Sequence, residues 1–342
     1  MPGRVICAAI VVCLALLARA ALAQDVTVEG NRFLRDGEPW VAEGVTLVGL
    51  VSPEGRLRNK PTYAAARAGF GPGMLGEARR FGADTVRFQV SQTALDPRSK
   101  DHELAYRDEV LDAVALARDE GLNVIVSMQW QGVSGRRVEG MPTGATRRAW
   151  ESILPAFGDD RGVLHEIFNE PEIDPRTKAE WEAWRKPMQE LIDALRRKGS
   201  ENVLLVDGTQ FARNLRGAPA LDDPLGQLGY AVHPYLGRHD RTRAQWQKKW
   251  GDFARTRPVM ATEWNAEAGG NYCWSEMAAP AEGLLDYLAE QRIGLVAWAL
   301  DMPNLRAADG SYTTLDDLVC GERRDGGRGG AGQMIHQHFL AN

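Results

Sequence analysis

The chain has 342 residues, of which 25% are charged and 44% hydrophobic, and its formal net charge at pH 7 is −5. This length is enough for one large domain with a substantial core. The acidic balance gives no indication of nucleic acid or an anionic membrane surface as a partner. The cysteines, Cys7, Cys13, Cys273 and Cys320, show neither metal-site spacing nor a CxxC redox motif.

Residues 1–23 have the pattern of a secretory signal peptide. Arg4 stands in a basic n-region, an apolar stretch covers residues 5–17, and Ala21-Leu22-Ala23 forms an A-x-A cleavage motif. The apolar stretch is short for a spanning helix, and no later segment resembles a stop-transfer sequence. We therefore expect cleavage before Gln24 and a secreted monomer, extracellular or periplasmic, with no membrane contact after signal removal. An uncleaved anchor is the alternative.

Short β-branched or apolar runs then alternate with longer amphipathic ones, which indicates βα units around a parallel sheet. Residues 25–39 alternate around Gly30-Asn31 and Asp36-Gly37 and predict a hairpin at the bottom of a barrel. Strands are predicted at residues 41–47, 85–90, 123–128, 164–168, 203–207, 230–233, 258–262 and 295–300. Helices are predicted at residues 75–81, 108–120, 147–157, 179–197, 243–254, 281–291 and 333–340. Eight strands with intervening helices predict a (β/α)8 TIM barrel as a single domain over residues 24–342.

A glycine-rich stretch lies near the end of the chain, at residues 321–332. Gly327, Gly329 and Gly332 match the G-x-G-x-x-G spacing of a dinucleotide site. That fingerprint needs a preceding strand and a following βαβ unit, and the chain ends about ten residues later. We interpret the stretch as a surface loop.

Polar side chains close several predicted strands. In a (β/α)8 barrel the active site lies at the carboxyl ends of the strands, so these side chains should point into it. Asn169 and Glu170 follow the fourth strand in LHEIFNEPEI, His233 and Tyr235 close the sixth in AVHPY, and Glu263 closes the seventh in ATEWN. Two carboxylates placed in this way suit glycoside hydrolysis, in which one acid protonates the leaving oxygen and the other attacks or directs water.

The motifs NEP, HPY and TEW, in this order and each at a strand end, make the chain resemble glycoside hydrolase family 5, within the clan of retaining (β/α)8 hydrolases. The resemblance covers essentially all of residues 24–342. It implies Glu170 as acid/base and Glu263 as nucleophile, with no metal or organic cofactor. It further implies Asn169 at the sugar 2-hydroxyl, Arg87 and Tyr235 supporting the nucleophile, His233 near the acid/base, and Trp298 as a platform for the sugar at the cleavage point.

These roles require particular charge states of the two carboxyl groups. A nucleophile must stay ionised, which a guanidinium and a tyrosine hydroxyl nearby would favour. An acid must stay protonated, which partial burial and a negatively charged neighbour would favour. Retention of configuration requires the two carboxyl groups to lie about 5 to 5.5 Å apart.

Gln129 departs from the family pattern. Family members close the third strand with a histidine, whereas this chain has VIVSMQW with Gln129 at that position. Glutamine can hydrogen-bond a sugar hydroxyl but cannot carry a proton or a positive charge. The departure therefore bears on the substrate more than on the mechanism.

Tryptophans indicate a sugar-binding surface. Trp130, Trp264, Trp274 and Trp298 lie at or just beyond predicted strand ends, where flat rings can stack on pyranose faces. A row of such rings suits a polysaccharide or oligosaccharide substrate. The tryptophans in helical patterns are instead predicted to pack in the core: Trp150, Trp181, Trp184, Trp246 and Trp250.

One disulfide is expected, between Cys273 and Cys320, because export removes Cys7 and Cys13 with the signal peptide. In an oxidising compartment a lone pair of cysteines forms a bridge, here between the loops after strands seven and eight. Two buried free thiols are the alternative.

The predicted function is thus a secreted, retaining endo-β-1,4-glucanase. An endo-β-mannanase on the same scaffold is a close alternative, and a transglycosylase would share every catalytic residue. A catalytically silent carbohydrate-binding barrel is the alternative of another class, which the retained glutamates argue against. Sugar, linkage and endo or exo mode depend on loops such as residues 48–70 and 131–146.

Overall fold

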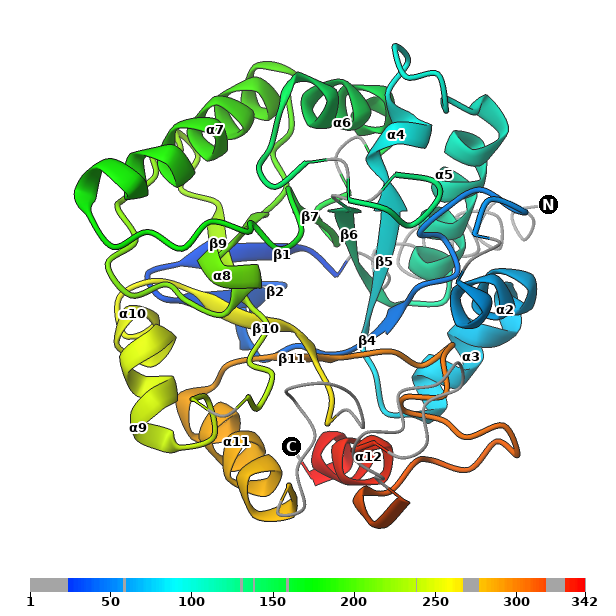
Figure 1. The fold of residues 1–342 in the computed structure, drawn as a ribbon, viewed down its shortest axis with the longest axis vertical. Helices are drawn as coiled ribbons and strands as arrows, with labels where there is room; N and C mark the ends of the chain where they lie inside the picture. The colour runs from blue at the N-terminus through cyan, green and yellow to red at the C-terminus, as the bar shows by residue number, and fades with distance from the viewer. Residues whose placement is uncertain are drawn as a thin grey trace, which may run out of the picture.

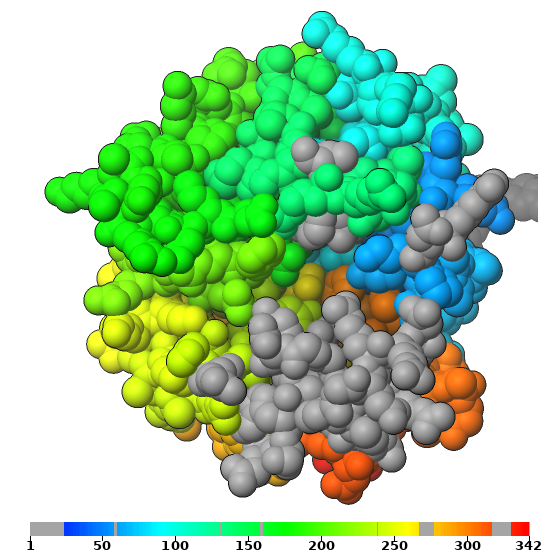
Figure 2. All heavy atoms as spheres, in the orientation of Figure 1, coloured from blue at the N-terminus to red at the C-terminus, as the bar shows by residue number. Residues whose placement is uncertain are grey.

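The computed structural model describes residues 24–57, 60–129, 132–137, 139–157, 160–237, 239–266, 277–317 and 330–341. Parallel strands close into a barrel in the order β10-β11-β4-β5-β6-β7-β8-β9, with helices around it (Figure 1). These strands are β4 (Glu43–Leu47), β5 (Thr85–Ser91), β6 (Asn123–Gln129), β7 (Val163–Glu166), β8 (Leu204–Asp207), β9 (Leu228–Val232), β10 (Val259–Trp264) and β11 (Leu295–Ala297). Each predicted strand overlaps one of them, so the predicted (β/α)8 barrel is confirmed. Seen from the same side, the molecular surface is hollowed near its centre (Figure 2).

Several sequence predictions lie outside the described residues. They are the signal peptide, the stacking roles of Trp130 and Trp274, and the disulfide between Cys273 and Cys320.

The helices match the predicted ones with three additions. They are α2 (Pro61–Gly69), α3 (Pro72–Arg80), α4 (Gln92–Leu95), α5 (Leu104–Asp119), α6 (Gly144–Phe157), α7 (Lys178–Arg197), α8 (Thr209–Ala212), α9 (Arg243–Trp246), α10 (Asp252–Ala254), α11 (Ala278–Gln291) and α12 (Gly332–Ala341), with a π-turn η1 (Gln247–Gly251) and a 3₁₀ turn η3 (Leu315–Asp317). α2, α4 and α8 were not predicted: α2 buries only Ala66, α4 has four residues, and α8 is a four-residue turn in which Gln210, Phe211 and Ala212 have positive φ. Within the described ranges, no helix has both the length and the apolarity needed to cross a bilayer.

A small antiparallel sheet closes one end of the barrel. β1 (Val26–Glu29), β2 (Arg32–Arg35) and β3 (Glu38–Trp40) form three strands, one more than the predicted hairpin. Phe33 packs so closely on Gly229 that a Cβ there would lie 2.6 Å from the phenyl ring. The same apolar cluster contains barrel-interior residues near the amino ends of their strands: Ile125, Leu164, Leu205, Met260 and Val296. The opposite end, where the strands terminate, is left for a site.

Side chains alternate between the barrel interior and the helix layer. Leu164 and Glu166 face the interior, whereas His165 faces α6 and packs on Trp150 and Phe157 with ring centroids 5.0 and 5.5 Å away.

Helical tryptophans hold the strand ends in place. Trp150 Nε1 donates to the carbonyl of Ile167 at 2.9 Å, and Trp184 Nε1 donates to the carbonyl of Asp207 at 3.1 Å. The predicted core packing is confirmed, because all of the helical tryptophans are buried: Trp150, Trp181, Trp184, Trp246 and Trp250. The helix layer therefore fixes β7 and β8 where they end.

β10 contains an irregularity that changes this alternation. Ala261 pairs with Leu295 and Trp264 pairs with Ala297, so β10 has one more residue than β11 between the two pairings. Such a β-bulge re-aims side chains, and bulges are frequent next to active sites. As a result, the consecutive residues Thr262 and Glu263 both face the barrel interior, where they contact Glu166 and Arg87 respectively.

Candidate active site

Arg87 on β5 connects the polar groups at the carboxyl end of the barrel. Its guanidinium is fully buried and donates twice to Glu166, at 2.5 and 2.9 Å, and once to Glu263 at 2.9 Å. It also donates to Asn169 Oδ1 at 2.6 Å and to Ser127 Oγ at 3.0 Å. Burial alone would lower the pKa of Arg87, but Glu166 and Glu263 raise it well above its ordinary value. The group is therefore a permanent cation that orients side chains from three other strands.

Glu263, on β10, is buried, with 6% of its surface exposed. Oε1 accepts a hydrogen bond from the Tyr235 hydroxyl at 2.9 Å, and Oε2 accepts from Arg87. Both side chains expected beside this carboxylate are thus in contact with it. Burial raises the pKa of Glu263 above its ordinary value. His233, Arg87 and Tyr235 lower this pKa, but not enough to cancel the rise. The nucleophile candidate is thus a weaker acid than a free glutamate, although its contacts with Arg87 and Tyr235 favour the ionised form.

Glu170 lies just beyond the end of β7, in a left-handed backbone conformation with φ of 54°. That conformation is uncommon for a residue with a side chain and costs about 1 kcal/mol or more. Asp207 holds it, because Oδ2 of Asp207 accepts the backbone N–H of Glu170 at 2.8 Å. The Glu170 side chain is 18% exposed and its Oε1 lies 3.0 Å from His233 Nδ1. One carboxylate oxygen of Glu170 and one of Glu263 lie within 4.8 Å of each other.

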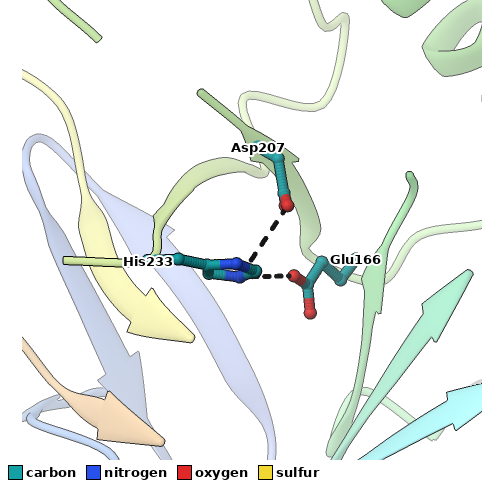
Figure 3. A group of neighbouring side chains, drawn as sticks. All are labelled: Glu166, Asp207 and His233. Atoms are coloured by element: carbon teal, nitrogen blue, oxygen red, sulfur yellow. Dashed lines mark ion pairs between the residues drawn. The ribbon is translucent and has the colours of Figure 1, made fainter. Parts of the chain in front are cut away.

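His233, which follows β9, is fully buried among acidic groups (Figure 3). Its Nε2 lies 3.1 Å from Thr262 Oγ1, 3.6 Å from Glu166 and 3.9 Å from Asp207. Burial alone would lower the pKa of His233, but the surrounding carboxylates raise it well above its ordinary value.

The two acids behind His233 differ in their charge. Burial would raise the pKa of Glu166, but Arg87 and His233 bring it well below the ordinary value. Burial and the negative charge of Glu166 instead raise the pKa of Asp207 well above its ordinary value. The surroundings therefore favour the ionised form of Glu166 and the neutral form of Asp207.

The acidic groups around His233 have metal-ligating chemistry, in two sets: Glu166 with Asp207, and Glu170 with Glu263. A metal would need a free lone pair on the imidazole. Both ring nitrogens of His233 are already engaged in hydrogen bonds. The arrangement fits a hydrogen-bonded network better than a metal centre.

Asn169 and Gln129 lie beside this network. Asn169 Oδ1 accepts from Arg87, which leaves the amide nitrogen as a donor toward a ligand. Gln129 is 2% exposed at the end of β6, and its Nε2 lies 3.3 Å from Ser127 Oγ. Contact of either side chain with a sugar stays a prediction.

The stacking role predicted for Trp264 is wrong for this structure, because the ring is fully buried. The bulge points Glu263 inward, so the next side chain packs in the core between barrel and helices. Trp298, by contrast, keeps 7% exposure beside Val48 and Ala66, and its peptide bond to Ala299 is cis. Its role as a sugar platform stays a prediction.

Five polar residues of the network were not predicted as site residues from the sequence: Gln89, Ser127, Glu166, Asp207 and Thr262. Four of them carry a readable signal, because they are polar residues at alternate positions of otherwise apolar strands and so share the interior face. Thr262 lies two residues after the interior residue Met260, so alternation also places it on this face, and the bulge is needed only for Glu263.

A family model supports this picture. The model of cellulase, glycosyl hydrolase family 5, matches residues 72–303. Endoglucanase C of Evansella cellulosilytica is 24% identical over 332 residues, covering 86% of this chain and 38% of the relative. Endoglucanase 5 of Pectobacterium carotovorum is 24% identical over 218 residues, covering 62% of this chain and 40% of the relative. The chain thus spans less than half the length of these two relatives.

Solved structures share the fold. A β-glucanase from Saccharophagus degradans aligns with a TM-score of 0.65 at 22% identity, covering 93% of both chains. A β-mannanase from Thermomonospora fusca aligns with a TM-score of 0.56 at 16% identity, covering 81% of this chain and 84% of the other. With a closed barrel, two facing glutamates at its carboxyl end and a family match over residues 72–303, the chain belongs to glycosyl hydrolase family 5.

Proposed function

We propose that this protein is a glycoside hydrolase, a secreted endo-β-1,4-glucanase that acts by double displacement, with Glu170 as acid/base and Glu263 as nucleophile. The observation that carries the proposal is the proximity of the two carboxylates, which have oxygens within 4.8 Å of each other. Retaining enzymes place the two carboxyl groups about 5 to 5.5 Å apart, whereas inverting enzymes need about 6.5 to 9.5 Å for an interposed water. The distance supports retention.

In the first step Glu263 attacks the anomeric carbon while Glu170 gives its proton to the departing oxygen. A glycosyl ester on Glu263 forms as the glycosidic bond breaks. Arg87 and Tyr235 hold the attacking carboxylate in place and favour its ionised form. In the second step Glu170 takes a proton from water, whose oxygen attacks the anomeric carbon and releases Glu263.

β-1,4-Glucan is the first candidate substrate, because the two sequence relatives described above are named endoglucanases. The β-glucanase from Saccharophagus degradans, moreover, has been solved with cellotetraose. β-Mannan is the second candidate, supported by the fold shared with the β-mannanase. Secretion rests on the signal-peptide pattern of residues 1–23.

Hydrolysis of soluble β-glucan, mannan, xylan and xyloglucan by the purified protein tests the proposal. Activity should appear on β-glucan, and Glu170→Ala and Glu263→Ala should each lose at least about 10³-fold in kcat. Glu290→Ala removes an exposed glutamate on α11 and serves as the matched control with unchanged activity. Release of the α-anomer as first product, followed by NMR, would contradict double displacement.

Azide rescue assigns the two roles separately. With an activated aryl glycoside, Glu263→Ala should give the α-glycosyl azide, because azide replaces the nucleophile directly. Glu170→Ala should give the β-azide, because azide then attacks the glycosyl ester. An exchange of these products between the variants would reverse the assignment.

A further inference from the structure

Thr262 determines which atoms around His233 carry protons. Glu166 is ionised through its two bonds to Arg87, so its oxygens can only accept hydrogen bonds. Thr262 Oγ1 therefore donates its single hydrogen to Glu166 Oε1 at 3.2 Å. The contact of Thr262 Oγ1 with His233 Nε2 at 3.1 Å must then be donated by the imidazole. Nε2 of His233 consequently carries a hydrogen.

The other ring nitrogen of His233 faces the two proposed catalytic carboxylates. Nδ1 lies 3.0 Å from Glu170 Oε1 and 3.9 Å from Glu263 Oε2. Since Nε2 is already protonated, a proton on Nδ1 makes the ring a cation. Carboxyl groups face the ring from β7, β8 and β10 and from the partly exposed segment after β7; the ionised ones before reaction are Glu166 and Glu263, and Arg87 is the cation that opposes them. The surroundings favour the imidazolium.

Asp207 offers the cation a neutral neighbour. Its Oδ2 accepts the backbone N–H of Glu170, and among the described residues its Oδ1 has no hydrogen-bond partner. A buried carboxylate with a bare oxygen beside ionised Glu166 favours the protonated form. The backbone bond to Glu170 does not need the negative charge.

The charges of the network then balance in both states of the reaction. Before reaction, Arg87 and His233 are positive, Glu166 and Glu263 are negative, and Glu170 is neutral. After the first step Glu263 is a neutral ester, and Glu170 is negative because it gave its proton to the leaving oxygen. The negative charge has moved between two carboxylates that face the same ring nitrogen, Nδ1, and the sum is unchanged. A fixed cation beside the two carboxylates can stabilise both states without a proton of its own moving.

We propose that Glu166, acting through Thr262, is a positioning residue that keeps His233 an imidazolium throughout the reaction. This fixed cation then stabilises the negative charge both when it is on Glu263 and when it is on Glu170. The inference rests on the proposed function for the movement of charge, but the protonation of His233 can be measured without turnover.

Thr262→Val tests the inference, because valine keeps the shape and removes the hydroxyl, and Thr262→Ser is the conservative control. In ¹⁵N-histidine NMR of the wild-type protein, with the His233 signal assigned by its loss in His233→Gln, both ring nitrogens should be protonated between pH 5 and 8. In Thr262→Val this signal should titrate within that window. Above the new pKa, kcat/KM on β-glucan should fall about tenfold per pH unit. Thr262→Ser should restore both the signal and the pH profile.

Two results would overturn the inference: a neutral His233 ring in the active wild-type protein, or a Thr262→Val variant whose pH profile runs parallel to the wild type. If Thr262→Val does not fold, Glu166→Gln replaces it, since the amide keeps the shape and removes the charge. Failure of the proposed function would look different. The wild-type protein would then be inactive on every polymer while still carrying the imidazolium signal.

Discussion

Arg87→Met should be one of the most destabilising substitutions in this barrel. Methionine keeps the unbranched chain but loses the buried guanidinium and its five hydrogen bonds. Removing one partner of a buried ion pair costs about 3–5 kcal/mol. The upper part of this range applies, because both Glu166 and Glu263 would be left as buried acids without their cation. At about 2 °C per kcal/mol for a large domain, a loss of about 4–5 kcal/mol should lower the Tm by about 8–10 °C.

A double-mutant cycle in urea at pH 7 tests the cause. Arg87→Met/Glu166→Gln removes both charges of the pair and should recover about 1–3 kcal/mol of the loss, because no uncompensated acid remains at Glu166. Arg161→Met breaks an exposed pair with Glu201 and should change the free energy of unfolding by less than about 1 kcal/mol. The reasoning is refuted if the two single losses simply add in the double variant.

Three further predictions follow from buried groups. The pKa that defines the acid limb of the kcat/KM profile should lie above the ordinary pKa of a glutamate, because burial raises the pKa of Glu263. Tyr235→Phe should raise this pKa further, because a hydrogen bond to the ionised form is lost. An unchanged acid limb in Tyr235→Phe would argue against Glu263 as its source. Burial lowers the pKa of His165 from 6.5 to about 3, so only the unfolded chain binds this proton between those values. The free energy of unfolding should therefore fall by up to about 1.4 kcal/mol per pH unit as acid is added below pH 6.5, and urea titrations of His165→Gln should show a smaller slope. Trp150→Phe removes the bond to Ile167 and opens a void, and should lower the free energy of unfolding at pH 7 by about 1–3 kcal/mol; a loss below about 0.5 kcal/mol would mean that α6 does not hold the end of β7.

The fold could be predicted because each barrel strand is a short apolar run and the runs are separated by helices. Both faces of such strands are buried, and the sequence shows this directly. The ends of the elements were less readable. The last strand was predicted at residues 295–300, whereas β11 ends at Ala297; beyond it the backbone still donates from Trp298 to Trp264 and from Leu300 to Thr46, but no longer in a regular ladder. Helix α2 has almost no buried face, so no apolar periodicity marks it.

The sequence predicts the outer layer of the candidate site, and it gives the inner residues a position on the interior face but not their charge states. Glu170, His233 and Glu263 stand where an apolar run gives way to polar residues, which is the signal that places them at the barrel mouth. Glu166 and Asp207 stand inside or at the end of such runs, and the shifts in their pKa values follow from burial and from their neighbours in space, chiefly Arg87 for Glu166 and Glu166 for Asp207. A pattern of residue types does not contain that neighbourhood.

The bulge in β10 explains both the success with Glu263 and the error with Trp264. In a regular strand continuing from Met260, Thr262 and Trp264 would face the barrel interior, and Glu263 would point into the helix layer. The extra residue places Thr262 and Glu263 on the interior face together and returns Trp264 to the core. One strand thereby supplies both the proposed nucleophile and the hydroxyl that orients the imidazole beside it. The chemistry of the site therefore depends on a backbone irregularity that the alternation of side chains would argue against.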